Sequence, residues 1–248
     1  MLNNRFIFII LSSKEPPNFF TKHLHMLMKQ EKLSAQNNFK QQQLSMGRVR
    51  TSYTEKWISL QRELHQKGFN DRFDLYVAAY KSEGKLEIWL KNKNQTKYSL
   101  FKTYDFSAHS GTLGPKTKNG DLQTPEGLYF IDRFNPDSKF YLSLGINYPN
   151  TTDLLRSGQN DPGSDIYIHG NQVTRGCIPL TDDKIKEVYI LAVEAKNSGQ
   201  THIPVHIFPF RMTKENMNTK VLSFPQHKAF WKTLQLTYDS LKKSKNPA

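Results

Sequence analysis

Short apolar runs, rich in aromatic and β-branched residues, recur through the middle of the chain with turn-forming clusters between them. Such runs are typical of β-strands. We expect strands in six segments: FDLYVAAY (73–80), KLEIWLK (85–91), YSLFKTYDF (98–106), GLYFIDRF (127–134), IYI (166–168) and THIPVHIFPF (201–210). This pattern predicts a mostly β, α+β domain over residues 71–210, built on a meander or small barrel-like sheet.

Helical spacing precedes these strands. Apolar residues recur three and four positions apart between residues 39 and 68: Val49, Tyr53, Trp57, Leu60 and Leu64. The spacing predicts one helix that lies against the domain that follows. Residues 1–38 are polar and irregular, so we expect region 1–70 to be a leader or linker followed by this helix.

Two more helices are expected toward the C-terminus. Thr181, followed by Asp182 and Asp183, has the hydroxyl cap and early acidic residues of a helix start. The stretch SFPQHKAFWKTLQLTYDSLKK (223–243) indicates a C-terminal helix, so residues 211–248 are expected to be a helical extension.

The N-terminal stretch MLNNRFIFIILSSKEPP has one positive charge and an apolar run from Phe6 to Leu11. A membrane span needs about 20 apolar residues, so we expect no integral membrane span. A secretory signal needs about 7 to 15 apolar residues and a small-residue cleavage site, so the export signal is weak. A degenerate signal, a misassigned start codon and a plain tail remain open.

The charge of the chain is strongly positive, with 35 Lys and Arg against 22 Asp and Glu. A basic protein favours anionic partners such as nucleic acid, membrane surfaces or wall polymers. The basic residues are scattered, and the sequence has neither zinc-finger spacing nor an aromatic RNA-binding signature. We therefore interpret the charge as a solvated surface and expect no nucleic-acid partner.

Candidate chemistry is concentrated in IYIHGNQVTRGCIPL (166–180), which holds the single cysteine, Cys177, and His169 eight positions before it. One cysteine excludes an intramolecular disulfide. A thiolate is favoured by an imidazole, a cation or a helix N-terminus, and His169, Arg175 and the expected helix start are all near in sequence. Gly176 permits a sharp turn that would aim backbone N–H groups at an oxyanion. From these residues alone, a catalytic thiol and a buried apolar cysteine remain alternatives.

No metal site is expected. His202 and His206 lie four apart but have Pro204 between them in a strand-like stretch. Structural zinc requires four ligands, and the sequence has no second Cys/His pair with ligand spacing. We interpret both histidines as ordinary strand residues.

The segment IHG…VTRGCIPLTD resembles the active-site signature of L,D-transpeptidase (YkuD-like) domains, in which a His-Gly pair precedes a Ser/Thr-x-Gly-Cys box. Three other stretches are similar to the family: SGTLGPKTKNGDLQTPEGLY, LSLGINYPN and IPVHIFPF. The resemblance spans residues 73–210. It implies a β-sandwich or barrel-like catalytic domain with flanking helices, working in the periplasm or cell envelope.

The resemblance also implies cysteine-dependent acyl transfer on peptidoglycan stem peptides, with no cofactor. Cys177 would form a thioester, His169 would take and return its proton, and a diaminopimelate amine would resolve the thioester. The Gly176 and Cys177 N–H groups would form the oxyanion hole. The Gly170 region would orient the imidazole through a backbone carbonyl, and Thr174 matches the Ser/Thr of the box.

Two features depart from the common family pattern. The His-to-Cys interval is short, and Pro179 stands where many members carry Arg or Asn to meet a substrate carboxylate. Both resemble a subgroup that includes peptidoglycan hydrolases. A transpeptidase, an L,D-carboxypeptidase or amidase that uses water, and a non-catalytic wall-binding module therefore remain alternatives.

Three weaker substrate-binding candidates complete the prediction. Arg175 could meet an anionic group, His109 could line the same cleft, and Gly127 ends a TPEG turn near it. Glu126, inside that turn, is given no role.

Overall fold

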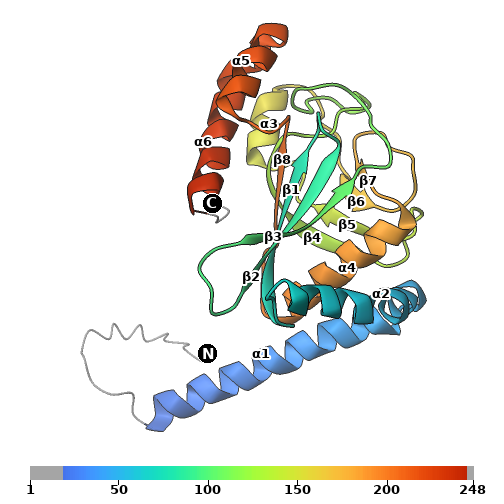
Figure 1. Ribbon diagram of the computed structural model, residues 1–248, viewed down its shortest axis with the longest axis vertical. Coiled ribbons are helices and arrows are strands. Elements are labelled where there is room, and N and C mark those ends of the chain that lie inside the picture. Colours follow the sequence, from blue (N-terminus) through green and yellow to red (C-terminus); the bar gives the residue numbers. More distant parts are fainter. Residues whose placement is uncertain (1–18, 245–248) are drawn as a thin grey trace, which may run out of the picture.

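The computed structural model describes residues 19–244 of the chain, and its centre is a curled sheet of eight strands (Figure 1). The strand order is β3-β2-β1-β8-β4-β5-β6-β7. The strands are β1 (Phe73–Tyr80), β2 (Lys85–Asn92), β3 (Ser99–Asp105), β4 (Gly127–Asn135), β5 (Ser143–Ile146), β6 (Tyr167–His169), β7 (Ile178–Pro179) and β8 (Pro204–Phe208). The predicted mostly β, α+β domain is confirmed.

β8 joins the two halves of the sheet. β1, β2 and β3 form an antiparallel meander, and Gly84 turns between β1 and β2 with a φ of 60°, which favours glycine. β8 then pairs in parallel with β1 and antiparallel with β4. β5 and β6 continue from β4, and the two-residue β7 pairs in parallel with β6 at the far edge.

Within residues 19–244, six α-helices flank the sheet: α1 (Phe19–Ser45), α2 (Gly47–Gln66), α3 (Thr151–Ser157), α4 (Asp182–Asn197), α5 (Lys214–Ser223) and α6 (Lys228–Ser244). α4 begins where the sequence predicts, because the Thr181 hydroxyl accepts a hydrogen bond from the Lys184 N–H. Its apolar side chains are buried in the main core with residues of β1, β2 and α2. The expected contact between the helix around Leu60 and the domain is confirmed.

The N-terminal helices correct one expectation. Residues 19–38 belong to α1 and are not irregular, and the expected helix over 39–68 is two helices that meet at Met46. α1 is favoured by its helix-forming residues and by the absence of internal Gly or Pro. It lacks the apolar periodicity on which the prediction was based. The first half of α1 extends beyond the domain (Figure 1). The possible leader, residues 1–18, lies outside the described residues.

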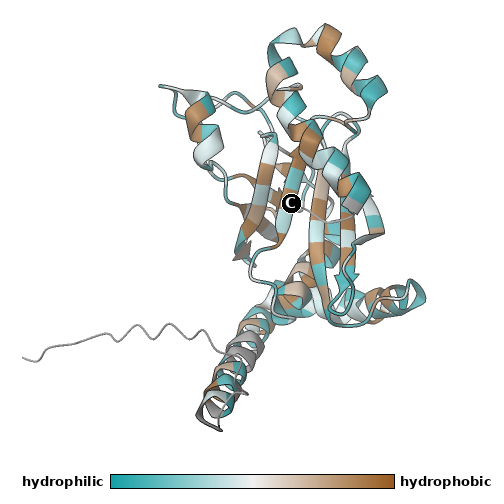
Figure 2. Ribbon diagram, turned by 90° about the vertical axis from the view of Figure 1, so that its left-hand side faces the viewer, coloured by the Kyte–Doolittle hydropathy of each residue, from teal (hydrophilic) through white to brown (hydrophobic). Residues whose placement is uncertain are grey.

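The C-terminal helices also differ from the prediction. The expected helical extension over 211–248 holds two helices: α5 lies before the one helix predicted over 223–243, and α6 begins at Lys228 because a 3₁₀ turn (Pro225–His227) precedes it. α6 packs on the sheet over a second core cluster, centred on Trp231, Phe208 and Tyr80. Figure 2 shows apolar residues along the strands and in bands along α5 and α6. Within residues 19–244, no helix combines the length and apolar character of a membrane span.

Candidate active site

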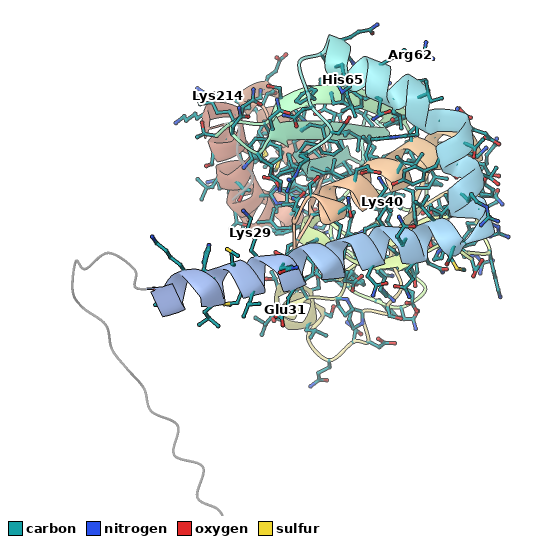
Figure 3. All side chains as sticks on the ribbon, turned by 90° about the horizontal axis from the view of Figure 1, so that it is seen from below. Lys29, Glu31, Lys40, Arg62, His65 and Lys214 are labelled. Carbon is teal, nitrogen blue, oxygen red and sulfur yellow. The ribbon has the colours of Figure 1, made fainter. Side chains whose placement is uncertain are left out.

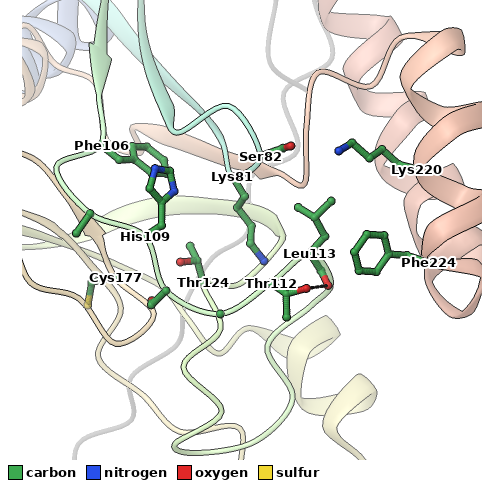
Figure 4. Close-up of a pocket in the computed structure, with 13 residues that line it drawn as sticks. Lys81, Ser82, Phe106, His109, Thr112, Leu113, Thr124, Cys177, Lys220 and Phe224 are labelled. Atoms are coloured by element: carbon green, nitrogen blue, oxygen red, sulfur yellow. Dashed lines mark hydrogen bonds between the residues drawn. The ribbon is translucent and has the colours of Figure 1, made fainter.

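Cys177 opens into a pocket of about 330 Å³ (Figure 4). The pocket lies between the end of β1, the loop that follows β3, the turn before β7, and α5. Cys177 is a free, partly exposed cysteine, and its thiol donates to the Asp165 carbonyl at 3.7 Å. The sulfur is therefore accessible from the pocket and is not sealed in the aliphatic core.

His169 ends β6 and is 1% exposed. Its Nδ1 lies 2.5 Å from the Gly170 carbonyl oxygen, which can only accept, so Nδ1 carries the proton and Nε2 is left as an acceptor. The ring stacks on Phe140 with centroids 4.5 Å apart. Burial lowers the pKa of His169 below its usual range, although the bond to Gly170 acts in the opposite direction. The imidazole is therefore neutral and oriented at neutral pH.

Strand pairing brings the thiol and the imidazole to neighbouring strands. His169 is in register with Pro179 in β7, and Cys177 directly precedes β7. Cys177 therefore lies in the bend immediately before the strand that pairs with the strand of His169. In the described part of the chain the thiol is hydrogen-bonded to Asp165 and the imidazole to Gly170, and the two side chains do not hydrogen-bond each other.

The Cys177 thiol is protonated in this arrangement. Burial raises its pKa, and the backbone of Tyr167 counters this through a hydrogen bond. The Asp165 carboxylate raises the pKa further, and the charge of Lys116 lowers it. The thiol and the imidazole are thus both neutral in this structure and do not form a resting ion pair.

The turn before the thiol requires its glycine. Gly176 has a φ of 109°, and a side chain there would come within 2.6 Å of the Gln123 carbonyl oxygen. Its N–H donates to the Ser110 hydroxyl at 2.8 Å. One of the two expected oxyanion donors is thus occupied by Ser110, a residue that the sequence did not single out.

Two expected support residues take structural positions beside the pair. The Thr174 hydroxyl donates to the Cys177 carbonyl at 2.8 Å and fixes the turn. Gly170 has no room for a side chain, because a Cβ would lie 2.7 Å from the Phe140 carbonyl oxygen. Its own carbonyl orients His169, as the resemblance implies.

The weaker candidates separate in space. His109 lines the pocket with Cys177, whereas the exposed Arg175 is not among the lining residues. Gly127 lies in another groove, lined also by Asn150 of the α3 cap and Phe230 of α6. No group of three or more potential metal-ligating side chains is found among residues 19–244.

Comparison with known proteins assigns the family. The model of the L,D-transpeptidase catalytic domain (YkuD) matches residues 74–207. YafK of Escherichia coli strain K12, named as a candidate L,D-transpeptidase, is 34% identical over 175 residues, which cover 70% of this chain and 68% of YafK. The chain belongs to the L,D-transpeptidase (YkuD) family. Members of this family act on peptidoglycan in the cell envelope.

Two solved structures are more distant. Pgp2, the helical cell shape determining protein of Campylobacter jejuni, has a TM-score of 0.43 and 21% identity, covering 63% of this chain and 58% of Pgp2. Bd1075 of Bdellovibrio bacteriovorus has a TM-score of 0.39 and 22% identity, covering 69% of this chain and 58% of Bd1075. The chain thus spans less than two thirds of either structure.

Part of the pocket wall lies outside the matched L,D-transpeptidase domain. Lys220 and Phe224 reach the pocket from α5. Lys81, at the end of β1, is buried and binds the Glu126 carboxylate at 3.0 Å. The sequence offered no signal for these residues, because a lone lysine or glutamate in an extension or loop is ordinarily a solvated charge.

Proposed function

We propose that this L,D-transpeptidase-family protein transfers the acyl group of a peptidoglycan stem peptide through a thioester at Cys177, which a diaminopimelate amine then resolves. The observation that carries the proposal is the accessible Cys177 thiol in a pocket, directly before the strand that pairs with the strand of His169, a buried imidazole whose Nε2 is left as an acceptor. A thiol and an imidazole suffice for acyl transfer, so the proposal needs no cofactor. Family membership favours the cell envelope as the place of action.

The reaction would begin with a rotation of the Cys177 side chain from the Asp165 carbonyl toward His169. Nε2 would take the thiol proton as sulfur attacks the peptide carbonyl, and the imidazolium would return it to the departing amine. The Gly170 carbonyl stabilises the imidazolium by accepting from Nδ1. Acceptor amine would then attack the thioester carbonyl and release the thiol.

The tetrahedral oxyanion would be stabilised by the backbone N–H groups of Cys177 and Gly176. The Gly176 N–H donates to the Ser110 hydroxyl in this structure, so a bound carbonyl would have to displace that hydroxyl. Ser110 could then rotate on its exposed loop and release the donor.

A hydrolase is the second candidate, using the same residues with water as the acceptor. It is favoured by Pro179, whose side chain offers no polar group at a position two residues from the sulfur. The product would be a cleaved stem peptide instead of a crosslinked dimer.

Mass analysis of products tests both candidates. Purified protein is incubated with muropeptides, and crosslinked dimer or water-cleaved peptide is measured. We expect Cys177→Ala to give neither product and His169→Gln to lower the rate about 10²–10⁴-fold, as for loss of a general base. The exposed His202→Gln serves as the control. Product formation by Cys177→Ala would overturn the proposal. A crosslinked dimer from the wild type would identify a transpeptidase, and a water-cleaved peptide would identify a hydrolase.

The neutral resting pair makes a separate prediction about alkylation. Only the thiolate reacts rapidly with iodoacetamide, and the pKa of Cys177 is raised by burial. We expect the alkylation rate of the folded protein to inflect above about pH 8.5, the ordinary thiol value. Since the chain has one cysteine, mass spectrometry reports this site alone. An inflection in the acidic range would instead indicate a preformed thiolate–imidazolium pair.

A further inference from the structure

The wall of the pocket opposite the thiol is built by the C-terminal extension. Lys220 and Phe224 project from the C-terminal end of α5 toward the loop that carries Leu113 and the end of β1 (Figure 4). Both residues lie outside the matched catalytic domain, residues 74–207. The pocket is therefore shared between the matched domain and the C-terminal segment that follows it.

The charged side chains that line this pocket are both lysines. His109, Lys81 and Lys220 line it, and no aspartate or glutamate is among the lining residues. The Lys81 ammonium is compensated, since it is paired with the buried Glu126 carboxylate at 3.0 Å. Lys220 is half-buried, and among residues 19–244 its ammonium has no carboxylate or carbonyl partner. An uncompensated ammonium in a concave site attracts an anionic ligand group.

Lys220 is also held in place relative to the thiol. α5 continues through the 3₁₀ turn into α6, where the Trp231 indole N–H donates to Glu126 at 2.8 Å. The other Glu126 oxygen accepts from the Gly114 N–H at 2.7 Å, within the loop that lines the pocket. The His227 ring lies directly over Gly114, where an added Cβ would come within 2.4 Å of Nε2. Helix and loop are thus fastened to one buried carboxylate.

From these observations we propose that Lys220 is a substrate-binding residue, which pairs with a free carboxylate of the donor stem peptide while Cys177 attacks its carbonyl. Phe224, at the same wall, packs against the aliphatic part of the peptide. This inference rests on the proposed function, because it takes the ligand to be the donor peptide. It assigns the C-terminal extension a role in substrate selection beyond the family domain.

Binding to Cys177→Ala, which cannot turn over, tests the inference by calorimetry. The ligands are a stem tetrapeptide and versions in which each free carboxylate in turn is an amide. We expect Lys220→Gln to weaken binding of the tetrapeptide about tenfold, as for loss of one charge-assisted hydrogen bond, and Lys220→Arg to retain most of it. One of the amide peptides should bind about as weakly to the protein with Lys220 as the tetrapeptide binds to the Lys220→Gln protein. The same peptide should lose no further affinity with Lys220→Gln, as expected when Lys220 pairs directly with the carboxylate that the amide replaces.

Lys214→Gln is the matched control, because Lys214 is an exposed lysine at the other end of α5 and does not line the pocket. The inference would be overturned if the Lys220→Gln and Lys214→Gln proteins bound the tetrapeptide equally well. It would also be overturned if the amide and Lys220→Gln weakened binding independently of each other. In either case, product formation by the wild type would leave the proposed function standing. A wild-type protein that forms no product and a Cys177→Ala protein that does not bind the tetrapeptide would overturn both.

Discussion

Two buried glutamates fasten the two helical extensions to the catalytic domain. Glu126 is fully buried and accepts the indole N–H of Trp231 on α6 at 2.8 Å. Glu194, on α4, is 3% exposed and accepts the hydroxyl of Tyr53 on α2 at 2.6 Å. Lys40 of α1, which points toward α4 in Figure 3, also binds Glu194, at 2.6 Å. A buried carboxylate thus holds the helices on each side of the domain.

The remaining partners of the two carboxylates differ. Glu126 also binds Lys81 and Gly114, so one carboxylate connects α6 to the wall and the loop of the Cys177 pocket. Glu194 instead connects α4 to the N-terminal helices. Burial of the Tyr53 side chain and the nearby charge of Glu194 both raise the pKa of Tyr53. The comparison indicates that the C-terminal extension belongs to the site, whereas the N-terminal extension contributes stability away from it.

Removing each carboxylate gives the largest expected contrast. Glu126→Ala leaves the buried Lys81 ammonium without its counter-charge and two buried N–H groups without their acceptor, at a cost of about 3–5 kcal/mol in the free energy of unfolding. Glu194→Ala should cost about 1–3 kcal/mol, because the ammonium of Lys40 lies closer to solvent. Urea unfolding measures both values.

Activity then separates the two variants. Measured where both are folded, kcat/KM should fall for Glu126→Ala and stay near wild type for Glu194→Ala. Equal losses would show that the N-terminal helices also shape the pocket and would break the comparison.

Lowering the pH should destabilise the C-terminal side of the molecule. His206 in β8 lies 3.4 Å from the Tyr76 hydroxyl, in the core under α6, and burial lowers its pKa to about 4 from an ordinary 6.5. Between these values the unfolded chain binds more protons than the folded one, so stability rises with pH. The neutral, buried His206 contributes its full share to the free energy of unfolding above pH 6.5. About 3 kcal/mol of this contribution is lost as the pH falls to about 4.

Urea unfolding of wild type and His206→Leu across this range isolates the effect, because other titrating groups are common to both. The Leu variant should lose less stability on acidification, and the exposed His202→Asn should behave as wild type. Hydrogen exchange should locate the acid-induced loosening in α6. Parallel curves for wild type and the Leu variant would contradict the assignment.

Much of the fold could be predicted because its determinants are local. The runs at 73–80 and 85–91 are rich in aromatic and β-branched residues and end at turn residues, and they form β1 and β2 with nearly those bounds. Thr181 caps α4 within its own turn. The first part of α1, residues 19–38, escaped prediction because its residues are helix-forming but the side chains that the structure describes there are exposed, so it shows no apolar stripe.

The site could be predicted only in part, for a related reason. His169 and Cys177 lie eight residues apart and were found together. Glu126 meets Lys81 and Trp231 across 45 and 105 positions, and neither pairing leaves a periodic trace in the sequence. Long-range pairing of single polar side chains depends on the completed fold, which is why the C-terminal wall of the pocket required the structure.

The smallest contrast comes from removing one hydrogen bond at each anchor. Trp231→Phe and Tyr53→Phe keep an aromatic ring and delete a donor to Glu126 or Glu194, and each should cost about 0.5–1.5 kcal/mol, the net range for one hydrogen bond, because each carboxylate keeps its other partners. With stability changed by similar amounts, function becomes the informative readout. Trp231→Phe should raise KM for the donor peptide because α5 and Lys220 are less firmly held, whereas Tyr53→Phe should leave KM unchanged. A rise in KM shared by both variants would mean that the pocket responds to global stability, and the separate role given to the C-terminal extension would then fail.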